Sequence, residues 1–203
     1  IDYTNSLFRD VSGSTRIHSI WDQTVVLENV EEQFAEEDSA DEDRNSSVSA
    51  SSRSPEGFLY GAEYTKAEIN RALQSSSPET IVPHRDENGH GTFLASIAAG
   101  SRDEENDFIG AAPECELVIV KLKEAKQYLR DFFYLSETEP LYQENDIMAG
   151  VAYVEDVAKR LNRPLVILLG VGSNQGSHTG TGPLSTYLDF IGFRRGRAVV
   201  VPA

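Results

Sequence analysis

The sequence has few of the features that would assign it to a membrane, a nucleic acid or an oxidising compartment. Its single cysteine, Cys115, permits no internal disulfide, so the fold does not depend on oxidation. No apolar run approaches the length that crosses a bilayer. Lys and Arg number 18 against 33 Asp and Glu, a net charge of -15. This charge excludes the positive surface that nucleic acids and anionic membranes require.

The start of the chain also lacks the marks of a targeting segment. Residues 1–8 contain no initiator Met, no charged stretch and no apolar signal core. The 203 residues, 39% of them hydrophobic, are nevertheless enough to bury a substantial core. Composition therefore predicts a globular domain without a membrane-inserted segment.

The segment that carries the clearest chemical signal is residues 86–100. His90 stands between two glycines and precedes a run of small and apolar residues that ends at Gly100. Four apolar residues fall at helical spacing: Phe93, Leu94, Ile97 and Ala98. The pattern predicts a buried helix that begins at the imidazole and stops at Gly100. A histidine in that place suits catalysis better than packing.

The first half of the chain contains one strand region, one acidic segment and one short helix. Residues 14–27 are rich in apolar and β-branched positions, which predicts a strand or hairpin. Residues 28–57 are acidic and Ser-rich, which favours a mobile surface insertion; an arm that binds calcium or a partner is the alternative. Thr65 and Glu68 have the spacing of a capping box for a short helix.

Strands and helices alternate in the second half. Residues 146–161 have apolar positions three and four residues apart, which predicts an amphipathic helix. The apolar run 165–169 indicates a strand that is buried on both faces. Pro183 begins another helix, and 198–201 form the next strand. The alternation predicts an α/β fold, with a parallel sheet and helices on both faces.

The His-Gly-Thr sequence at His90 resembles the histidine motif of the subtilisin-like serine proteases, or subtilases. Residues 108–122 resemble the turn and inner strand that follow in that family, and 198–203 resemble the strand that leads to its oxyanion-hole asparagine. Residues 16–24 are similar to a narrower group, the clostridial subtilases that include spore germination proteases. The resemblance implies a subtilisin-like fold and a bacterial, secreted or spore-associated protein.

The resemblance implies that residues 1–203 are a partial catalytic domain, incomplete at both ends. Ile1, Asp2 and Tyr3 resemble the residues that follow the family's aspartate motif, so Asp2 is not the catalytic aspartate. No Gly-Thr-Ser nucleophile motif is present. His90 is then the general base and the one triad member in this chain. We expect the complete protein to be a serine endopeptidase for peptides or proteins, and this chain alone to be inactive.

The resemblance also implies a substrate-binding strand at Gly170, Val171 and Gly172. The family has Ser-Leu-Gly at this place, where the backbone pairs with the substrate as an added strand. Pairing uses main-chain groups and is expected to survive the substitutions, whereas the shape of the pocket changes. The loop that follows, 173–178, is interpreted as structural.

Other candidate residues are interpreted as structural. We expect His18, His84 and His178 to be surface or loop histidines. Carboxylates on both sides of Cys115 oppose a thiolate, which disfavours a cysteine nucleophile. Residues 103–107 are interpreted as a solvated turn, with a calcium site as the alternative. No set of side chains has zinc-ligand spacing, and no cofactor is expected.

Two other interpretations compete with the protease. The first is a pseudoprotease that keeps the subtilase fold for binding or regulation. The second is an unrelated α/β binding module in which the tripeptide at His90 is accidental. The first predicts that the complete protein lacks an activated serine. The second predicts that the imidazole is buried against large side chains.

Overall fold

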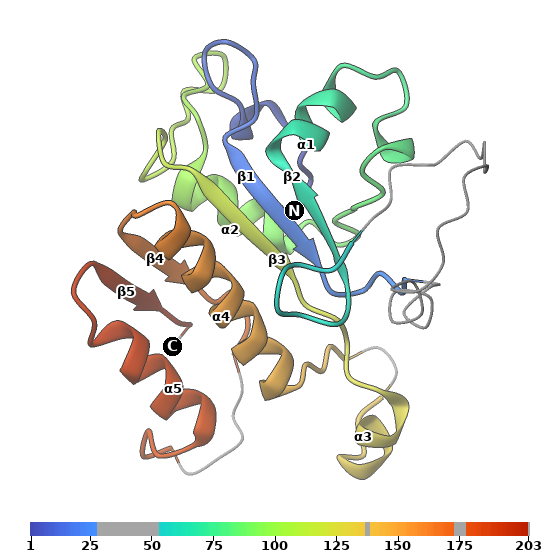
Figure 1. Cartoon of the computed structure of the whole chain (residues 1–203), viewed down its shortest axis with the longest axis vertical. Helices are drawn as coiled ribbons and strands as arrows, with labels where there is room; N and C mark the ends of the chain where they lie inside the picture. The colour runs from blue at the N-terminus through green and yellow to red at the C-terminus, as the bar shows by residue number, and fades with distance from the viewer. Residues whose placement is uncertain (28–52, 137–138, 173–177, 203) are drawn as a thin grey trace, which may run out of the picture. The chain divides into compact units, whose positions relative to one another are not determined.

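The computed structural model describes residues 1–27, 53–136, 139–172 and 178–202 (Figure 1). These residues divide into two compact units, residues 1–121 and 122–203. Most of the acidic segment 28–57 lies outside the described residues, so the prediction of a mobile insertion stays a prediction.

The first unit is built on a three-stranded sheet. β1 (Ile17–Asp22) lies at its centre, between β2 (Ala62–Thr65) and β3 (Leu117–Lys121) (Figure 1). β1 pairs antiparallel with β2 and parallel with β3. The side chains of Ile20 and Trp21, which are neighbours and point to opposite faces, are both fully buried. The predicted strand within 14–27 and the parallel strand after residue 108 are thus confirmed.

Helix α1 (Lys66–Leu73) begins at the predicted capping box. The backbone N–H of Glu68 donates to the Thr65 hydroxyl at 3.4 Å, and the Glu68 carboxylate accepts from the Thr65 N–H at 2.8 Å. This exchange satisfies two N–H groups that the helix itself leaves unpaired. α1 then contributes two side chains to a core cluster whose members are Ile1, Tyr3, Phe8, Ile17, Ile20, Ala62, Tyr64, Ile69, Ala72 and Val82.

Helix α2 (His90–Ala99) has the predicted bounds but not the predicted burial. Ser96 and Ala99 are buried, whereas Phe93 is 63% exposed and Ile97 is 50% exposed. Phe93 and Ile97 are four residues apart and therefore share one face of the helix. The expectation of a buried helix therefore holds for one face of α2 only: the small residues make the contact, and the described residues of the first unit leave the larger apolar face uncovered.

The end of α2 is held by Arg16, which is buried. Its guanidinium donates to the Leu7 carbonyl at 3.0 Å, to the Cys115 carbonyl at 2.7 Å and to the carbonyl of Ala99, the last residue of the helix. A cation at a helix C-terminus is favoured by the partial negative charge of the free carbonyls. Arg16 therefore fixes α2 against the loops around it.

The described residues of the second unit form α3 (Gln127–Phe132), α4 (Glu144–Arg160), β4 (Leu165–Leu168), α5 (Pro183–Gly192) and β5 (Arg197–Val200). β4 and β5 pair in parallel, with Leu165 opposite Arg197. α4 packs on β4 and α5 packs on β5. The predicted amphipathic helix, the helix that begins at Pro183 and both strands are confirmed.

The strand expected to be buried on both faces is covered on one face only by the described residues of the second unit. Ile167 is buried, but its neighbours Val166 and Leu168 are 69% and 43% exposed. Val200 on β5 is exposed as well. Successive side chains of a strand point to opposite faces, so the helices cover the face of Ile167 and leave the other open. Within the first unit the strand order is β2-β1-β3, and within the second unit β4 lies beside β5.

Helix α3 was not predicted, because six residues are too few to show a helical period. Its buried residue is Arg130, which donates to the Glu139 carbonyl at 2.5 Å and to the Glu124 carboxylate at 2.6 Å. Tyr128 and Phe132 on the same helix are exposed.

Among the described residues, no helix has the length and apolarity that crossing a membrane requires.

Candidate active site

His90 is the first residue of α2, and it is exposed to solvent. Gly89 caps the helix with a φ of 78°, a left-handed conformation that L side chains rarely adopt. The backbone N–H of His90 donates to the Asn88 side chain at 2.9 Å. The Gly89–His90 turn therefore presents the imidazole at the surface instead of walling it in with bulky side chains. The binding-module interpretation, which expected a buried imidazole, does not fit this exposure.

Asp86 fixes the turn in front of His90. Its carboxylate accepts from the Thr92 backbone N–H at 2.8 Å and from the Thr92 hydroxyl at 2.5 Å. The other oxygen accepts from the Gly89 N–H at 3.0 Å. The turn and the first residues of α2 are thus tied to one side chain, whose negative charge suits a helix N-terminus.

These contacts lower the pKa of Asp86. Burial acts to raise it, but the hydrogen bonds from the Thr92 hydroxyl and backbone lower it from 3.8 to about 2. The carboxylate is therefore ionised at neutral pH and keeps its donors. No sequence pattern identified Asp86 as a functional residue; its place three residues before Gly89 was the available signal.

The Asp2 carboxylate lies in a local turn. It is exposed and accepts from the backbone and the hydroxyl of Thr4, at 2.9 Å and 2.7 Å. The backbone N–H of Asp2 donates to the Thr92 hydroxyl at 2.7 Å. Asp2 thus contributes backbone to the support of α2, and the expectation that it is not the triad aspartate stays a prediction.

His84 lies in a loop, one of the two expected alternatives, but it is not a surface residue. Its side chain is fully buried, and Nδ1 lies 2.7 Å from Oδ2 of Asp22. Burial would raise the pKa of Asp22, whereas the hydrogen bonds with His84 and Thr24 lower it. The two residues are 62 positions apart. Asp22 lies in the segment 16–24 that resembles the clostridial subtilases, but no pattern in the sequence links it to His84. His18 is half-buried in β1, so the expectation of a surface or loop position is wrong for it, whereas His178 is exposed and lies outside helices and strands.

The predicted substrate strand, Gly170–Gly172, follows β4 directly. The Leu169 N–H donates to the Val200 carbonyl at 2.9 Å, which extends the ladder by one residue towards Gly170. A Cβ on Gly172 would lie 3.1 Å from the Pro202 ring, so glycine suits this close approach. Gly170 and Val171 are half-buried. These residues belong to the second unit and His90 belongs to the first.

Comparison with known proteins assigns the chain to a family. The family model described as the subtilase family, peptidase S8, matches residues 29–153, more than half of the chain. The chain belongs to the subtilase family.

One similar solved structure is that of the Clostridium perfringens CspB protease, with a TM-score of 0.70 and 27% sequence identity. The match covers 99% of this chain and 33% of that one, so this subtilase chain spans about a third of the protease's length. No curated protein matches the chain. The predicted subtilisin-like α/β class is thus confirmed.

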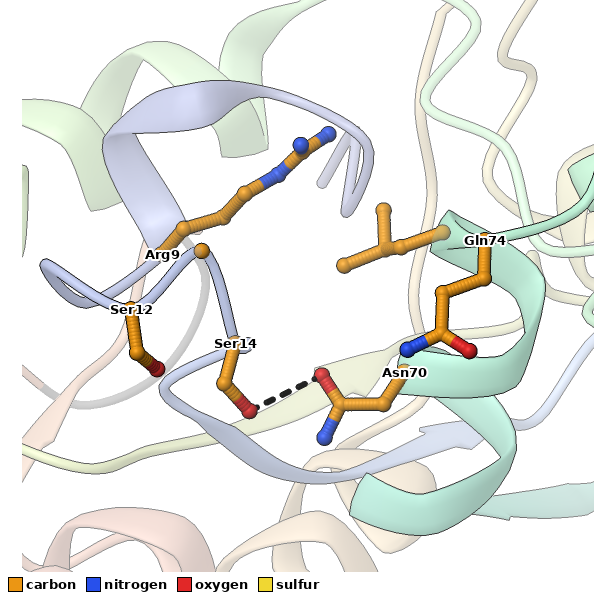
Figure 2. Close-up of a pocket in the computed structure, with 7 residues that line it drawn as sticks. Arg9, Ser12, Ser14, Asn70 and Gln74 are labelled. Atoms are coloured by element: carbon orange, nitrogen blue, oxygen red, sulfur yellow. Dashed lines mark hydrogen bonds between the residues drawn. The ribbon is translucent and has the colours of Figure 1, made fainter.

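Two cavities of this subtilase chain lie away from the candidate residues. Figure 2 shows one of about 250 Å³, between the loop that carries Ser12 and Ser14 and the end of α1, where Asn70 and the C-cap residue Gln74 line it. The Ser14 hydroxyl donates to the Asn70 side chain there, at 3.1 Å. A second cavity, of about 390 Å³, is lined partly by Lys159 and three arginines. Neither includes His90 or residues 170–172.

The remaining candidates have structural surroundings. The Asp103 carboxylate accepts from the backbone of Glu105 and from the backbone and side chain of Asn106, so it is occupied within its own turn. Cys115 is half-buried. In the part of the chain that the structure describes, no group of three or more His, Cys, Asp or Glu side chains could hold a metal ion.

Proposed function

We propose that the complete protein is a serine endopeptidase in which His90 is the general base. The observation that carries this proposal is the setting of His90: an exposed imidazole at the first residue of a helix, in a turn fixed by Asp86. The family match and the similarity to a clostridial protease support the same chemistry.

The setting of His90 implies a carboxylate partner. The N-terminus of a helix carries partial positive charge, which disfavours the imidazolium that forms when a base takes the proton of serine. A carboxylate that orients and stabilises the ring offsets this effect. We propose that this aspartate precedes Ile1 in the complete protein, since Ile1 lies against the start of α2: its nitrogen would be 3.5 Å from a Cβ on Gly91.

The substrate-binding part of the proposal rests on Gly170, Val171 and Gly172. They continue β4 beyond its last ladder residue, and an extended peptide can add to such a segment through main-chain hydrogen bonds. The substrate is therefore a peptide or an exposed protein segment in extended conformation. The nucleophilic serine is supplied by another part of the protein, and residues 1–203 alone are inactive.

A fluorophosphonate probe tests the proposal, since it reacts with an activated serine and requires no knowledge of the substrate. We expect the complete protein to be labelled, and we expect His90→Ala to lower the labelling rate by about 10²–10⁴-fold, the usual contribution of a general base. His178→Ala, an exposed histidine of the second unit, is the matched control and should label like the wild type. Folded wild-type protein that is not labelled would favour the pseudoprotease.

A further inference from the structure

The buried pair of Asp22 and His84 has no role in the chemistry described so far. Asp22 is the last residue of β1, and both side chains are removed from solvent, with exposures of 2% and 0%. Oδ1 of Asp22 accepts from the Thr24 N–H at 2.9 Å and from the Thr24 hydroxyl at 2.5 Å, which leaves Oδ2 for His84. Because the carboxylate is ionised, it accepts, and Nδ1 of His84 carries the proton. The carboxylate is thereby oriented from both sides.

His84 cannot itself act as a base on substrate. Its side chain is fully buried, and its Nε2 has no hydrogen-bond partner among the described residues. A buried polar atom without a partner destabilises the fold by about 1–3 kcal/mol, so a histidine at this place needs a compensating role. The contact that compensates is the charge-assisted hydrogen bond from Nδ1 to Asp22.

The segment that contains His84 leads directly to the turn before His90. Residues 82–86 form no helix or strand, so their position depends on contacts with other elements. The Val82 carbonyl accepts from the Tyr3 hydroxyl at 2.9 Å, and the Arg85 carbonyl accepts from the Lys121 ammonium at 3.0 Å. Between these two backbone contacts lies a third, the hydrogen bond from His84 to Asp22, which is both buried and charge-assisted.

The same segment ends at Asp86, which holds the start of α2. The path from β1 to His90 therefore runs from Asp22 to His84, along two peptide units to Asp86, and from Asp86 to Thr92 and Gly89. Each step is a short covalent link or a hydrogen bond of 3.0 Å or less. A general base must lie within hydrogen-bond reach of its proton, and a displacement of about 1 Å can cost about 10²-fold in rate.

We propose that Asp22 and His84 are a positioning pair, which holds residues 82–86 against β1 and thereby sets the position of His90. This inference rests on the proposed function, because it assigns the pair to the geometry of that general base. The pair acts through Asp86 and never touches substrate. Loss of the Nδ1 donor lets the segment move, so the catalytic rate falls while substrate binding, which uses other residues, is retained.

Two substitutions of His84 in the complete protein separate positioning from folding. His84→Leu removes the donor and keeps an apolar side chain in the buried site. His84→Asn keeps a donor, because its side-chain amide nitrogen takes the place of Nδ1. We expect His84→Leu to lower the fluorophosphonate labelling rate and kcat by about 10–100-fold, with KM within about twofold of the wild type. We expect His84→Asn to recover the rate to within about threefold.

Hydrogen exchange gives a readout that does not need activity. We expect the amides of residues 82–92 to exchange faster in His84→Leu, and at the wild-type rate in His84→Asn and in the surface control His178→Leu. If wild-type protein is not labelled, the proposed function fails, whereas the exchange rates still test the positioning pair. If His84→Leu does not fold, Asp22→Asn replaces it, with the same faster exchange expected.

Two results would overturn the inference. One is unchanged exchange over residues 82–92 when the donor or the carboxylate is removed. The other is a His84→Asn variant that is as impaired in rate as His84→Leu, since then the hydrogen bond to Asp22 is not what matters.

Discussion

The two units differ in how completely their own side chains cover their strands. In the first unit, β1 is buried on both faces, with Ile20 and Trp21 fully enclosed. In the second unit, β4 alternates between the buried Ile167 and the exposed Val166 and Leu168. β4 is the more apolar of the two strands, yet β1 is enclosed by its neighbours and β4 is covered by helices of its own unit on one face only. An apolar strand is therefore buried only where another element packs against each face.

The units also differ in their polar contacts. The first unit buries Arg16 and the pair of Asp22 and His84, each with hydrogen-bond partners from distant parts of the chain. These contacts hold α2 at both ends. In the second unit, the buried Arg130 and Glu155 form ion pairs with Glu124 and Arg194. The residues that fix the candidate general base are thus concentrated in the first unit.

Among the substitutions that test this difference between the units, Trp21→Ala is expected to lower the free energy of unfolding the most. Trp21 is fully buried, contacts the rings of Phe58 and Tyr60, and donates to the Tyr60 carbonyl at 3.1 Å. Its loss should lower the free energy of unfolding by about 3–5 kcal/mol in urea titrations. Phe193→Ala is the matched aromatic change in the second unit, where the ring is 95% exposed, and should cost less than about 0.5 kcal/mol. Equal costs would contradict the difference in burial between the two rings.

The second largest effect on the free energy of unfolding is expected from Arg16→Met. This change keeps much of the side-chain volume but removes the guanidinium donor from the carbonyls of Ala99 and Cys115 and one of two donors from that of Leu7, which also accepts from the Ser101 N–H. We expect a loss of about 2–4 kcal/mol in the free energy of unfolding and faster hydrogen exchange at the end of α2. Arg102→Met, which removes an exposed ion pair with Glu104, should change stability by less than about 1 kcal/mol. A small effect at Arg16 would mean that α2 is held by its backbone alone.

Sequence patterns predicted the local parts of this structure and missed the distant ones. The capping box at Thr65, the helix from His90 and the amphipathic α4 are set by residues within a few positions of one another. The pairing of Asp22 with His84 joins residues 62 positions apart, and no periodicity reports it. The exposure of Val166 was missed for a related reason: composition shows that a residue is apolar, but not what covers it.

The ionisation of Asp86 is expected to have a smaller effect on the free energy of unfolding. Its pKa is about 2 in the folded protein and about 3.9 for an unperturbed aspartate. A lowered pKa stabilises the fold fully above about pH 4, and this contribution is lost as the pH falls from 4 to 2. Wild type should therefore lose on the order of 1 kcal/mol more than Asp86→Asn over that window, after screening by solvent. Urea midpoints at pH 5 and pH 2.5 provide the measurement, and parallel losses in both proteins would contradict it.

The smallest expected effect concerns the open face of β4. Val166→Thr keeps a β-branched shape at an exposed position, so it should change the free energy of unfolding by less than about 0.5 kcal/mol. Ile167→Thr places a hydroxyl at the next residue, which is buried, and should cost about 2–3 kcal/mol. Measuring the free energy of unfolding of the same two variants in the complete protein tests whether the exposed face of β4 is covered there. A cost at Val166 that rises to that at Ile167 would mean that other residues of the protein cover this face. The difference in burial between β1 and β4 would then be a feature of residues 1–203 alone and would be absent from the complete protein.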